Sequence, residues 1–328
     1  MQVISPTINE WREFVEGLPN YSFFQLPIWA ETFEKTYPDC KIATKLFTFD
    51  DGIEVLVPLV ETSYKLGFKS FESLPGGGYG GFLWNKRPSE AQLKQLLKHI
   101  LNKKVLSLAI FPNPLDWESL QFLEDNGFEC KKAFTHILKL DKHEVLWGNL
   151  THACKKNIKQ AQRENLKLVE GQLDDLGPSY YEMYRDSAKR WDMEEKGMIP
   201  LEFFQKLMQV DGEKIKLFFV EKEGRKIAGV IMGYGKGESF QWHAVSFYQY
   251  ENLRPTNFWE WEVIRDAYEK GYEIHNFGAS IGLPGVQRFK ESFGAEKLDY
   301  KYFIYESPLL KAYRKIKTAL RFTKRSKT

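Results

Sequence analysis

The sequence predicts an α+β protein, an α/β mixed-sheet fold whose mixed, mostly antiparallel sheets are flanked by helices and divided between two domains. The first observation is length, because 328 residues are many for one globular domain. The second is that strand-sized apolar runs alternate with helix-sized amphipathic segments along the whole chain. The third is that the second half repeats the pattern of the first without a low-complexity linker, which favours two domains with a shared interface.

The elements of the first predicted domain, residues 1–140, follow from local signals. Asp50-Asp51-Gly52 between two apolar runs indicates a hairpin, Pro88 and Ser89 open a helix, and Gly127 ends one. The expected helices cover 10–17, 28–36, 89–102 and 116–126, and the expected strands cover 41–49, 53–61, 105–111 and 129–140.

The second predicted domain, residues 141–307, contains a hairpin turn at Glu223-Gly224 and a helix closed by Gly271. The expected helices cover 144–164, 173–191, 201–210 and 257–270, and the expected strands cover 166–170, 215–221, 226–233 and 239–245. Residues 308–328 form a third segment, a basic amphipathic tail.

Composition excludes several classes of protein. The hydrophobic fraction is 43% and the charged fraction 28%, which is typical of a folded soluble chain. Because the apolar stretches are only strand-sized, we expect no signal peptide and no membrane span. The three cysteines are far apart in sequence, which indicates no disulfide or zinc framework and favours a reducing, cytoplasmic location. No metal or redox cofactor is implied.

The last third of the chain carries the most specific motifs. A strand with Gln241-Trp242-His243-Ala244 leads through Arg254-Pro255-Thr256-Asn257 into a helix, then into 274–280, and then into 285–294 with its Arg-Phe-Lys-x-x-Phe-Gly run. This order resembles the acyl-transfer half of the FemA/FemB/FemX family, within the wider GNAT acyltransferase superfamily. The resemblance runs from about residue 150 to 305 and is weaker before that. It implies two tandem GNAT-like domains and attack of a primary amine on an activated acyl carbonyl.

The resemblance suggests catalytic residues. Lys290 matches a lysine near the transferred carbonyl, where a cation stabilises the developing oxyanion. His243 has a side chain suited to deprotonating an incoming ammonium, and Tyr248 and Glu260 are alternative proton acceptors. Taken without the family pattern, Lys290 reads as a solvated helix lysine and His243 as a half-buried strand histidine with a satisfied ring.

Basic residues suggest contacts with phosphate. Lys155, Lys159 and Arg163 share one helical face beside Lys156, which suits a nucleotide-linked sugar, a lipid diphosphate or a tRNA acceptor stem, or is simply a solvated face. Typical acetyl-CoA enzymes of the superfamily have a Gly-rich phosphate loop where this chain has Glu251 to Phe258. The missing glycines argue against a CoA diphosphate cradle and favour the FemA/FemB/FemX branch, and that resemblance implies an aminoacyl-tRNA donor. Arg254 is left to attract one phosphate or to serve as an ordinary loop residue.

Other candidates for substrate contact come from loops. The loop 73–81 has five glycines but no P-loop ending, and it presents Tyr79 either to a substrate or to a bulge between strands. Backbone N–H groups after the strand at 274–277 can face the donor or acceptor. The remaining candidates are Arg190, Trp242, Asn257, Asn276, Gly278, Ser280 and Arg288.

The tail is strongly basic, with eight Lys or Arg residues and no acidic residue between Lys311 and Thr328. Leu309, Tyr313, Ile316 and Leu320 recur on one helical face, so the tail is either a helix resting on an anionic membrane surface or a packed terminal helix with a frayed end.

We therefore expect an aminoacyltransferase of FemX-like type. Its donor would be an aminoacyl-tRNA and its acceptor a peptidoglycan precursor or another cell-envelope saccharide. The alternatives are an acyl-CoA-dependent N-acyltransferase acting on an amino sugar in polysaccharide assembly, and a non-catalytic protein that binds lipid-linked saccharides.

Overall fold

The computed structural model describes residues 1–210, 212–280 and 282–325. The chain divides into two compact units, each with its own core. Unit 1 comprises Met1–Leu18, Gln25–Ala133 and the segment from Tyr300 onwards, and unit 2 comprises Pro19–Phe24 and Phe134–Asp299.

Unit 1 contains two sheets. The larger has the order β15-β8-β6-β5-β2, in which β6 and β8 are parallel and α3 lies in the connection between them. The smaller has the antiparallel order β1-β3-β4-β7. The strands are β1 (Gln2–Ile4), β2 (Cys40–Ile42), β3 (Lys45–Thr48), β4 (Glu54–Val57), β5 (Val60–Ser63), β6 (Lys69–Ser73), β7 (Leu83–Trp84), β8 (Val105–Ile110) and β15 (Glu296–Glu306).

The helices of unit 1 begin and end at the expected signals. Ser89 caps α3 in a reciprocal capping box with Gln92, and Gly127 ends a 3₁₀ helix in the left-handed conformation. The described helices are α1 (Ile8–Glu16), α2 (Pro27–Thr36), α3 (Glu90–Ile100), the 3₁₀ helix Trp117–Asn126 and α10 (Pro308–Arg325). One core cluster joins α3 and this 3₁₀ helix to strands of both sheets, and Phe47, Leu96, Leu108 and Phe303 are fully buried members of it.

The predicted strands 41–49 and 53–61 are each divided. Their halves next to the turn become β3 and β4 of the small sheet, whereas their outer halves become β2 and β5 of the large sheet. Pro58 lies at the break between β4 and β5, and because it has no backbone N–H it cannot continue the ladder. The hairpin itself was predicted correctly.

Unit 2 is built on a sheet of order β10-β11-β12-β13-β14-β9. All neighbours are antiparallel except β13 and β14, which are parallel and joined through α8 (Pro255–Glu269). Glu223 and Gly224 both have positive φ angles, the geometry of the two-residue hairpin turn predicted there. The strands are β9 (Glu129–Lys139), β10 (Lys167–Glu170), β11 (Ile215–Lys222), β12 (Arg225–Tyr234), β13 (Glu238–Ser246) and β14 (Ile274–Asn276).

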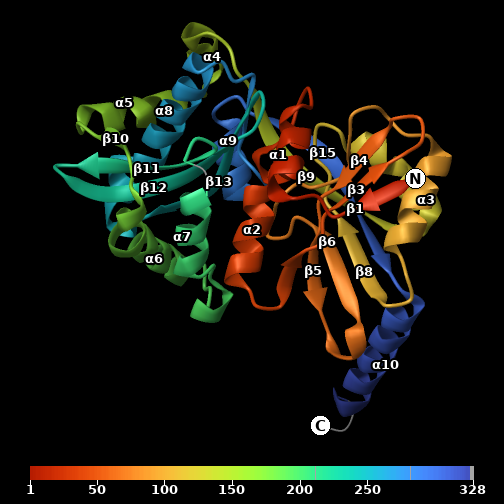
Figure 1. Cartoon of the computed structure of the whole chain (residues 1–328). Coiled ribbons are helices and arrows are strands. Elements are labelled where there is room, and N and C mark those ends of the chain that lie inside the picture. Colours follow the sequence, from red (N-terminus) through yellow and green to blue (C-terminus); the bar gives the residue numbers. More distant parts are fainter. Residues whose placement is uncertain (211, 281, 326–328) are drawn as a thin grey trace. The chain divides into compact units, whose positions relative to one another are not determined.

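Helices cover both faces of the unit 2 sheet (Figure 1). On one face α5 (His152–Arg163) and α8 pack Ala161 and Trp259 against Val230. On the other face lie α6 (Glu182–Arg190) and α7 (Leu201–Val210), with α4 (His143–Asn149) and α9 (Pro284–Glu291) completing the unit.

The prediction of a single long helix at 144–164 is wrong. The structure has α4 and α5 instead, because the chain is extended at Leu150 and Thr151 and the Thr151 hydroxyl caps α5 by accepting from the Cys154 N–H at 3.3 Å. The helix predicted at 173–191 likewise starts with a 3₁₀ turn and a π turn, Leu176–Tyr181, before α6. Pro178 lies in that π turn, where its missing N–H interrupts regular α-helical bonding.

The unit boundaries differ from the predicted domains 1–140, 141–307 and 308–328. Strands β9 and β15 each pass from one unit into the other, so residues 134–140 belong to unit 2 and residues from 300 onwards belong to unit 1. The reason is long-range pairing, since β15 pairs Phe303–Glu306 with Ile110–Ser107 of β8 and buries Phe303 completely.

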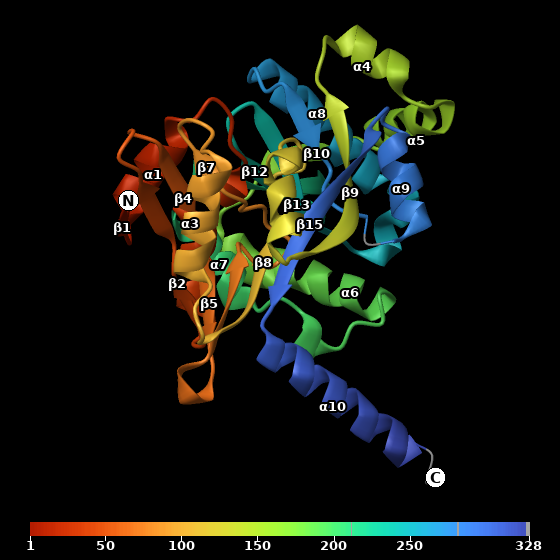
Figure 2. The same cartoon turned by 90° about the vertical axis from the view of Figure 1, so that its right-hand side faces the viewer.

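Helix α10 extends away from the rest of unit 1 (Figure 2). Leu309, Tyr313 and Ile316 are 55%, 57% and 61% exposed on it. The side chain predicted to continue this stripe, Leu320, lies outside the described side chains. Within the described residues, none of the helices combines the length and apolar character that crossing a membrane requires.

Candidate functional site

The parallel strands β13 and β14 part after a short pairing. Only Glu238, Ser239 and Phe240 pair with β14, after which Phe277 donates its N–H to the His136 carbonyl of β9 at 2.9 Å. On its other edge β13 has a register shift against β12 that leaves Trp242 without an opposite residue, a β-bulge. Bulges re-aim side chains and occur often beside active sites. In open sheets the ends of parallel strands at such a parting are where ligands bind, so this point is the candidate site.

Gly278 lies against β13 beside the bulge. It has a φ of +69°, and a Cβ there would come within 3.3 Å of both the Gln241 carbonyl oxygen and the Phe240 ring. Any side chain would therefore push the loop 277–280 away from β13. The predicted glycine is needed for this close approach.

Asn276 fixes the start of the loop. Its side-chain oxygen accepts from the Thr135 hydroxyl at 2.8 Å and from the Gly278 N–H at 3.0 Å, and its NH₂ donates to Glu238 at 2.9 Å. All of these side chains are buried, and burial raises the pKa of the Glu238 carboxyl. Asn276 therefore holds the start of the loop in place. It was predicted as a substrate contact, and its exposed fraction is 0%.

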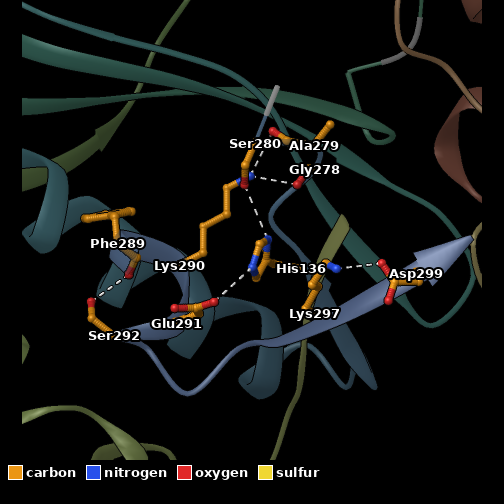
Figure 3. A network of polar contacts seen from close by, with 10 residues as sticks. All are labelled: His136, Gly278, Ala279, Ser280, Phe289, Lys290, Glu291, Ser292, Lys297 and Asp299. Atoms are coloured by element: carbon orange, nitrogen blue, oxygen red, sulfur yellow. Dashed lines mark hydrogen bonds and ion pairs between the residues drawn. The ribbon is translucent and has the colours of Figure 1, made fainter. Parts of the chain in front are cut away.

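Lys290 reaches the same loop from α9 (Figure 3). Lys290 is 3% exposed, and its ammonium donates to the Gly278 carbonyl at 2.6 Å and the Ala279 carbonyl at 2.9 Å. Burial lowers its pKa to about 8, with the charge of Glu260 acting in the opposite direction. An ammonium has three N–H groups, so among the described residues these two acceptors leave one donor for a further ligand. The predicted oxyanion-stabilising cation lies at the candidate site.

A row of polar side chains links β13 and β14 to α8. His275 contacts Glu260 through Nε2 at 3.0 Å and Ser239 through Nδ1 at 3.0 Å, and all three are fully buried. Burial raises the pKa of Glu260. Because Ser239 lies on β13, His275 on β14 and Glu260 on α8, this cluster holds α8 against the strands.

A second row of polar side chains runs from the loop to solvent. Ser280 Oγ is 3.3 Å from His136 Nδ1, and His136 Nε2 is 3.7 Å from Glu291 Oε1 (Figure 3). Burial, and next the charge of Lys290, lowers the pKa of His136. Ser280 was among the predicted contacts, whereas His136 and Glu291 were not.

His243, the predicted base, is engaged by its neighbours. The Tyr180 hydroxyl lies 2.7 Å from His243 Nδ1 and also donates to the His243 carbonyl at 2.9 Å. The aromatic rings of Tyr184 and Phe204 pack on the imidazole, and burial lowers its pKa to about 4. The imidazole is therefore neutral at pH 7 and is held by Tyr180.

Tyr248 and Arg190 lie together beyond the far end of β13. Arg190 ends α6 and donates to the Ser246 carbonyl at 2.7 Å, and its guanidinium lies 5.6 Å from the centre of the Tyr248 ring. The Tyr248 side chain is exposed. Their neighbours in sequence, Lys189 and Phe247, help to line a surface pocket of about 390 Å³. The structure does not place these two residues with Lys290, whereas Trp242 is in the bulge and packs on Phe203 and Phe204.

The basic face of α5 is mostly solvated. Lys156, Lys159 and Arg163 are exposed, whereas Lys155 bends back to donate to the Gly148 carbonyl at 3.0 Å. Lys159 lies over the Trp147 ring at 5.9 Å. The opposite face buries Cys154, Ile158 and Ala161, so the predicted sharing of one exposed face by residues 159 and 163 holds.

The start of α8 offers few free N–H groups. Arg254 has a left-handed φ of +59° and donates its N–H to the Glu251 carbonyl at 3.0 Å, and Pro255 has none to donate. The Arg254 Nε is buried without a described partner. Asn257 is buried and directed at Cys154, 3.8 Å away, rather than at solvent, and Arg288 on α9 is exposed.

Tyr79 and the Gly-rich loop belong to unit 1. The Tyr79 side chain is 3% exposed and lies edge-on to Tyr300 at 6.1 Å. At Gly78 a Cβ would come within 2.8 Å of the Trp29 indole nitrogen, and at Gly80 within 2.7 Å of the Ser73 carbonyl oxygen. These glycines are required for packing, so the loop does not form an open phosphate cradle.

Sequence reasoning missed the two histidine clusters. The signal was present, because His136 and His275 each stand beside an apolar residue within a buried strand, where an ionisable side chain needs a partner. The partners themselves are far away in sequence. Among the described residues, no group of three or more His, Cys, Asp or Glu side chains is arranged to hold a metal.

Comparison with known proteins bears on the same segment. Residues 152–291, from α5 to α9, match the family model described as an acetyltransferase (GNAT) domain. The matched segment includes both the bulge of β13 and Lys290. No curated protein matches the sequence.

Solved structures resemble nearly the whole chain. A crystal structure of FemX superposes with a TM-score of 0.76 at 15% identity, covering 95% of this chain and 99% of that one. L-PGS from Bacillus licheniformis gives 0.56 at 14% identity, covering 92% of each chain. A tandem GNAT protein from the clavulanic acid biosynthesis pathway gives 0.53 at 11% identity, covering 92% of this chain and 94% of that one. The predicted fold class, mixed sheets flanked by helices in a tandem GNAT-type arrangement, is confirmed.

Proposed function

We propose that this protein is an acyltransferase that forms an amide between an activated acyl group and a primary amine. The observation that carries the proposal is Lys290, whose buried ammonium binds the loop at which β13 and β14 part. That loop lies within the segment that matches an acetyltransferase (GNAT) domain. A fixed cation there stabilises the oxyanion formed when an amine attacks an ester or thioester carbonyl.

The first-choice donor is an aminoacyl-tRNA, and the acceptor is a peptidoglycan precursor or another cell-envelope saccharide that carries a primary amine. The likeness to FemX over 95% of the chain supports this choice at the level of fold. The start of α8 supports it chemically, since Pro255 and the engaged Arg254 N–H leave fewer amides for a CoA diphosphate. The exposed cations of α5 suit a phosphate-bearing substrate. The acyl donor serves as co-substrate, and no separate cofactor takes part.

A second candidate is an acyl-CoA-dependent N-acyltransferase acting on an amino sugar in polysaccharide assembly. The description of the matching family model as an acetyltransferase domain favours it. A third candidate is a non-catalytic protein that binds lipid-linked saccharides. It requires function in cells to survive replacement of Lys290.

We also propose that the protein works in the cytoplasm with α10 resting on an anionic membrane surface. Leu309, Tyr313 and Ile316 form an exposed apolar stripe, and Lys311, Lys315 and Lys317 flank it. Arg314 is engaged by Glu306. Each basic residue near an anionic surface contributes about 1 kcal/mol to binding.

The deciding experiment combines ligand stabilisation with product detection. Purified protein is heated with acetyl-CoA, longer acyl-CoAs, a UDP-linked muramyl peptide, and charged or uncharged tRNA, because a ligand of the folded state raises the melting temperature. Amide products are then sought by mass spectrometry. Stabilisation and turnover with charged tRNA and the muramyl peptide would support the first candidate, whereas a response to a CoA ester would replace it with the second.

Lys290→Met tests the proposed chemistry in whichever reaction is found. We expect kcat to fall by about a hundredfold to a thousandfold with little change in KM, as for removal of other oxyanion donors. Lys270→Met is the matched control, because Lys270 is an exposed lysine paired with Asp266 at the end of α8. Equal activity of the two variants would eliminate Lys290 as the oxyanion-stabilising residue.

A further inference from the structure

The reaction proposed above assigns no role to His136. It lies in β9 with an exposed fraction of 0%, between Ser280 on the loop and Glu291 on α9 (Figure 3). Its Nδ1 is 3.3 Å from Ser280 Oγ, and its Nε2 is 3.7 Å from Glu291 Oε1. These three residues, 136, 280 and 291, are called the Ser-His-Glu chain below.

The contact between Ser280 and His136 suits proton transfer. In the neutral tautomer with the proton on Nε2, the Ser280 hydroxyl donates to the lone pair of Nδ1. The gap of 3.7 Å to Glu291 is too long for a hydrogen bond but short enough for the carboxylate to attract a cation. Burial and the nearby charge of Lys290 lower the pKa of His136 and keep the ring neutral at pH 7. Of the other charged groups around it, Lys297 lowers this pKa and Glu291 raises it.

The chain connects the candidate site to the surface. Ser280 is 2% exposed and follows Gly278 and Ala279, whose carbonyls bind Lys290. The Glu291 side chain is 51% exposed. One end therefore lies at the loop that holds the proposed oxyanion cation, and the other end lies in water.

The matched cluster Ser239, His275 and Glu260 has the same residue types but differs in one respect. All three of its members are fully buried, so it has no end at the surface. It also lies beneath the strands rather than on the loop after them. Among the described residues, only the Ser-His-Glu chain joins the candidate loop to an exposed carboxylate through a histidine.

We propose that the Ser-His-Glu chain shuttles the proton of acyl transfer, an inference that rests on the proposed function. As the neutral amine attacks the acyl carbonyl, its nitrogen loses a proton to Ser280 Oγ, and the Ser280 proton passes to His136 Nδ1. The Glu291 carboxylate stabilises the resulting imidazolium. When the tetrahedral intermediate breaks its bond to the leaving group, the proton returns through Ser280 to the leaving oxygen or sulfur. The amine has gained an acyl group, the leaving group has gained the proton, and the chain is restored.

Ser280 is the catalytic residue of this scheme, because its hydroxyl meets the reacting amine. His136 and Glu291 act through it and are positioning residues. The scheme explains why an ionisable residue is buried at 136, where an apolar side chain would avoid the cost of desolvation.

Steady-state kinetics of His136→Gln, Ser280→Ala and Glu291→Gln test the shuttle. We expect His136→Gln and Ser280→Ala each to lower kcat by about a hundredfold with KM nearly unchanged, as for loss of a positioned proton acceptor. The double variant should lose no more than either single variant, because the two residues act as one unit. In the wild type, protonation of His136 should cause kcat to fall at acid pH. This fall, the acid limb of the pH profile, should vanish in His136→Gln and move to lower pH in Glu291→Gln, because the Glu291 charge raises the pKa of His136.

His275→Gln is the control for structural damage. It removes a buried histidine of the other cluster, so it should lower the melting temperature but keep the acid limb. Losses in the double variant that multiply, or an acid limb that persists in His136→Gln, would overturn the shuttle. If no donor is turned over at all, the proposed function fails instead. Nitrogen NMR of His136 then decides the inference, since a proton found on Nδ1 at pH 7 would contradict it and an unprotonated Nδ1 would keep it.

Discussion

The most unusual single residue is Lys290, a cation buried at 3% exposure with two backbone carbonyls as its acceptors. The folded pKa of about 8 lies below the ordinary value of 10.5. Both folded and unfolded chains are protonated below pH 8, so the cost of burying the charge is fully present there. Between pH 8 and 10.5 the unfolded chain binds more protons, and the free energy of unfolding therefore rises with pH.

This linkage gives a prediction for Lys290→Met. The wild type should gain about 2 kcal/mol of stability relative to the variant between pH 7 and pH 10, because only the wild type sheds the buried charge. Denaturant titration of both proteins at several pH values measures the difference, and titration of the groups that the Lys290 charge does not affect cancels in it. If the free energy of unfolding of the two proteins changed with pH in the same way, Lys290 would have an ordinary pKa.

Gly278 is the second residue with a specific consequence. Gly278→Ala should destabilise the protein by about 1–3 kcal/mol and reduce activity, because the new Cβ must displace the loop from β13 as well as adopt a φ of +69°. Gly282→Ala is the control, since its φ is +72° but a Cβ there meets nothing within 4 Å. Equal effects of the two variants on activity would show that contact with β13 is irrelevant.

At the scale of elements, the break between α4 and α5 matters most, because α5 opens the segment that matches the acetyltransferase domain. Thr151 makes the break by capping α5, and its N–H also donates to the Ser292 carbonyl just after α9 at 3.0 Å. The element that carries Lys290 and Glu291 is thus tied to the first turn of α5.

Thr151→Ala should lower the free energy of unfolding by about 1 kcal/mol, the usual cost of a lost N-cap. Thr151→Ser keeps the hydroxyl and should remain close to the wild type. Chemical denaturation measures both variants. A Thr151→Ala protein as stable as Thr151→Ser would contradict the role of the cap.

At the scale of the whole molecule, β15 brings the end of the chain back into unit 1. Phe303 is fully buried in that core, and β15 pairs with β8. The polypeptide segments before and after unit 2 must therefore both be present for unit 1 to be complete.

Two truncations test this organisation. A chain ending at Ser307 keeps β15 and loses only α10, so it should melt as the full chain does but no longer sediment with phosphatidylglycerol vesicles. A chain ending at Ala295 loses β15 as well and should lose the cooperative unfolding of unit 1. Circular dichroism and limited proteolysis follow the fold, and vesicles of neutral phosphatidylcholine are the lipid control. Vesicle binding that survives removal of α10 would refute the membrane role of this helix.

The sequence alone determined much of the secondary structure, since capping residues, glycine turns and apolar periodicity act between near neighbours. The hairpin at Glu223-Gly224, the start of α3 at Ser89 and the end of the 3₁₀ helix at Gly127 are such cases. The motif around Lys290 was also visible in the sequence, and its lysine binds the carbonyls of Gly278 and Ala279.

Only the tertiary structure decided the unit boundaries and the chemistry of the site. The return of β15 to β8 depends on pairing between residues nearly two hundred positions apart, as Phe303 with Ile110. The Ser280–His136 contact joins positions separated by 144 residues. The lowered pKa values of Lys290 and His243 arise chiefly from burial. Protonation and proton transfer depend on desolvation and distance in space, and these exist only once the distant strands and helices have packed together.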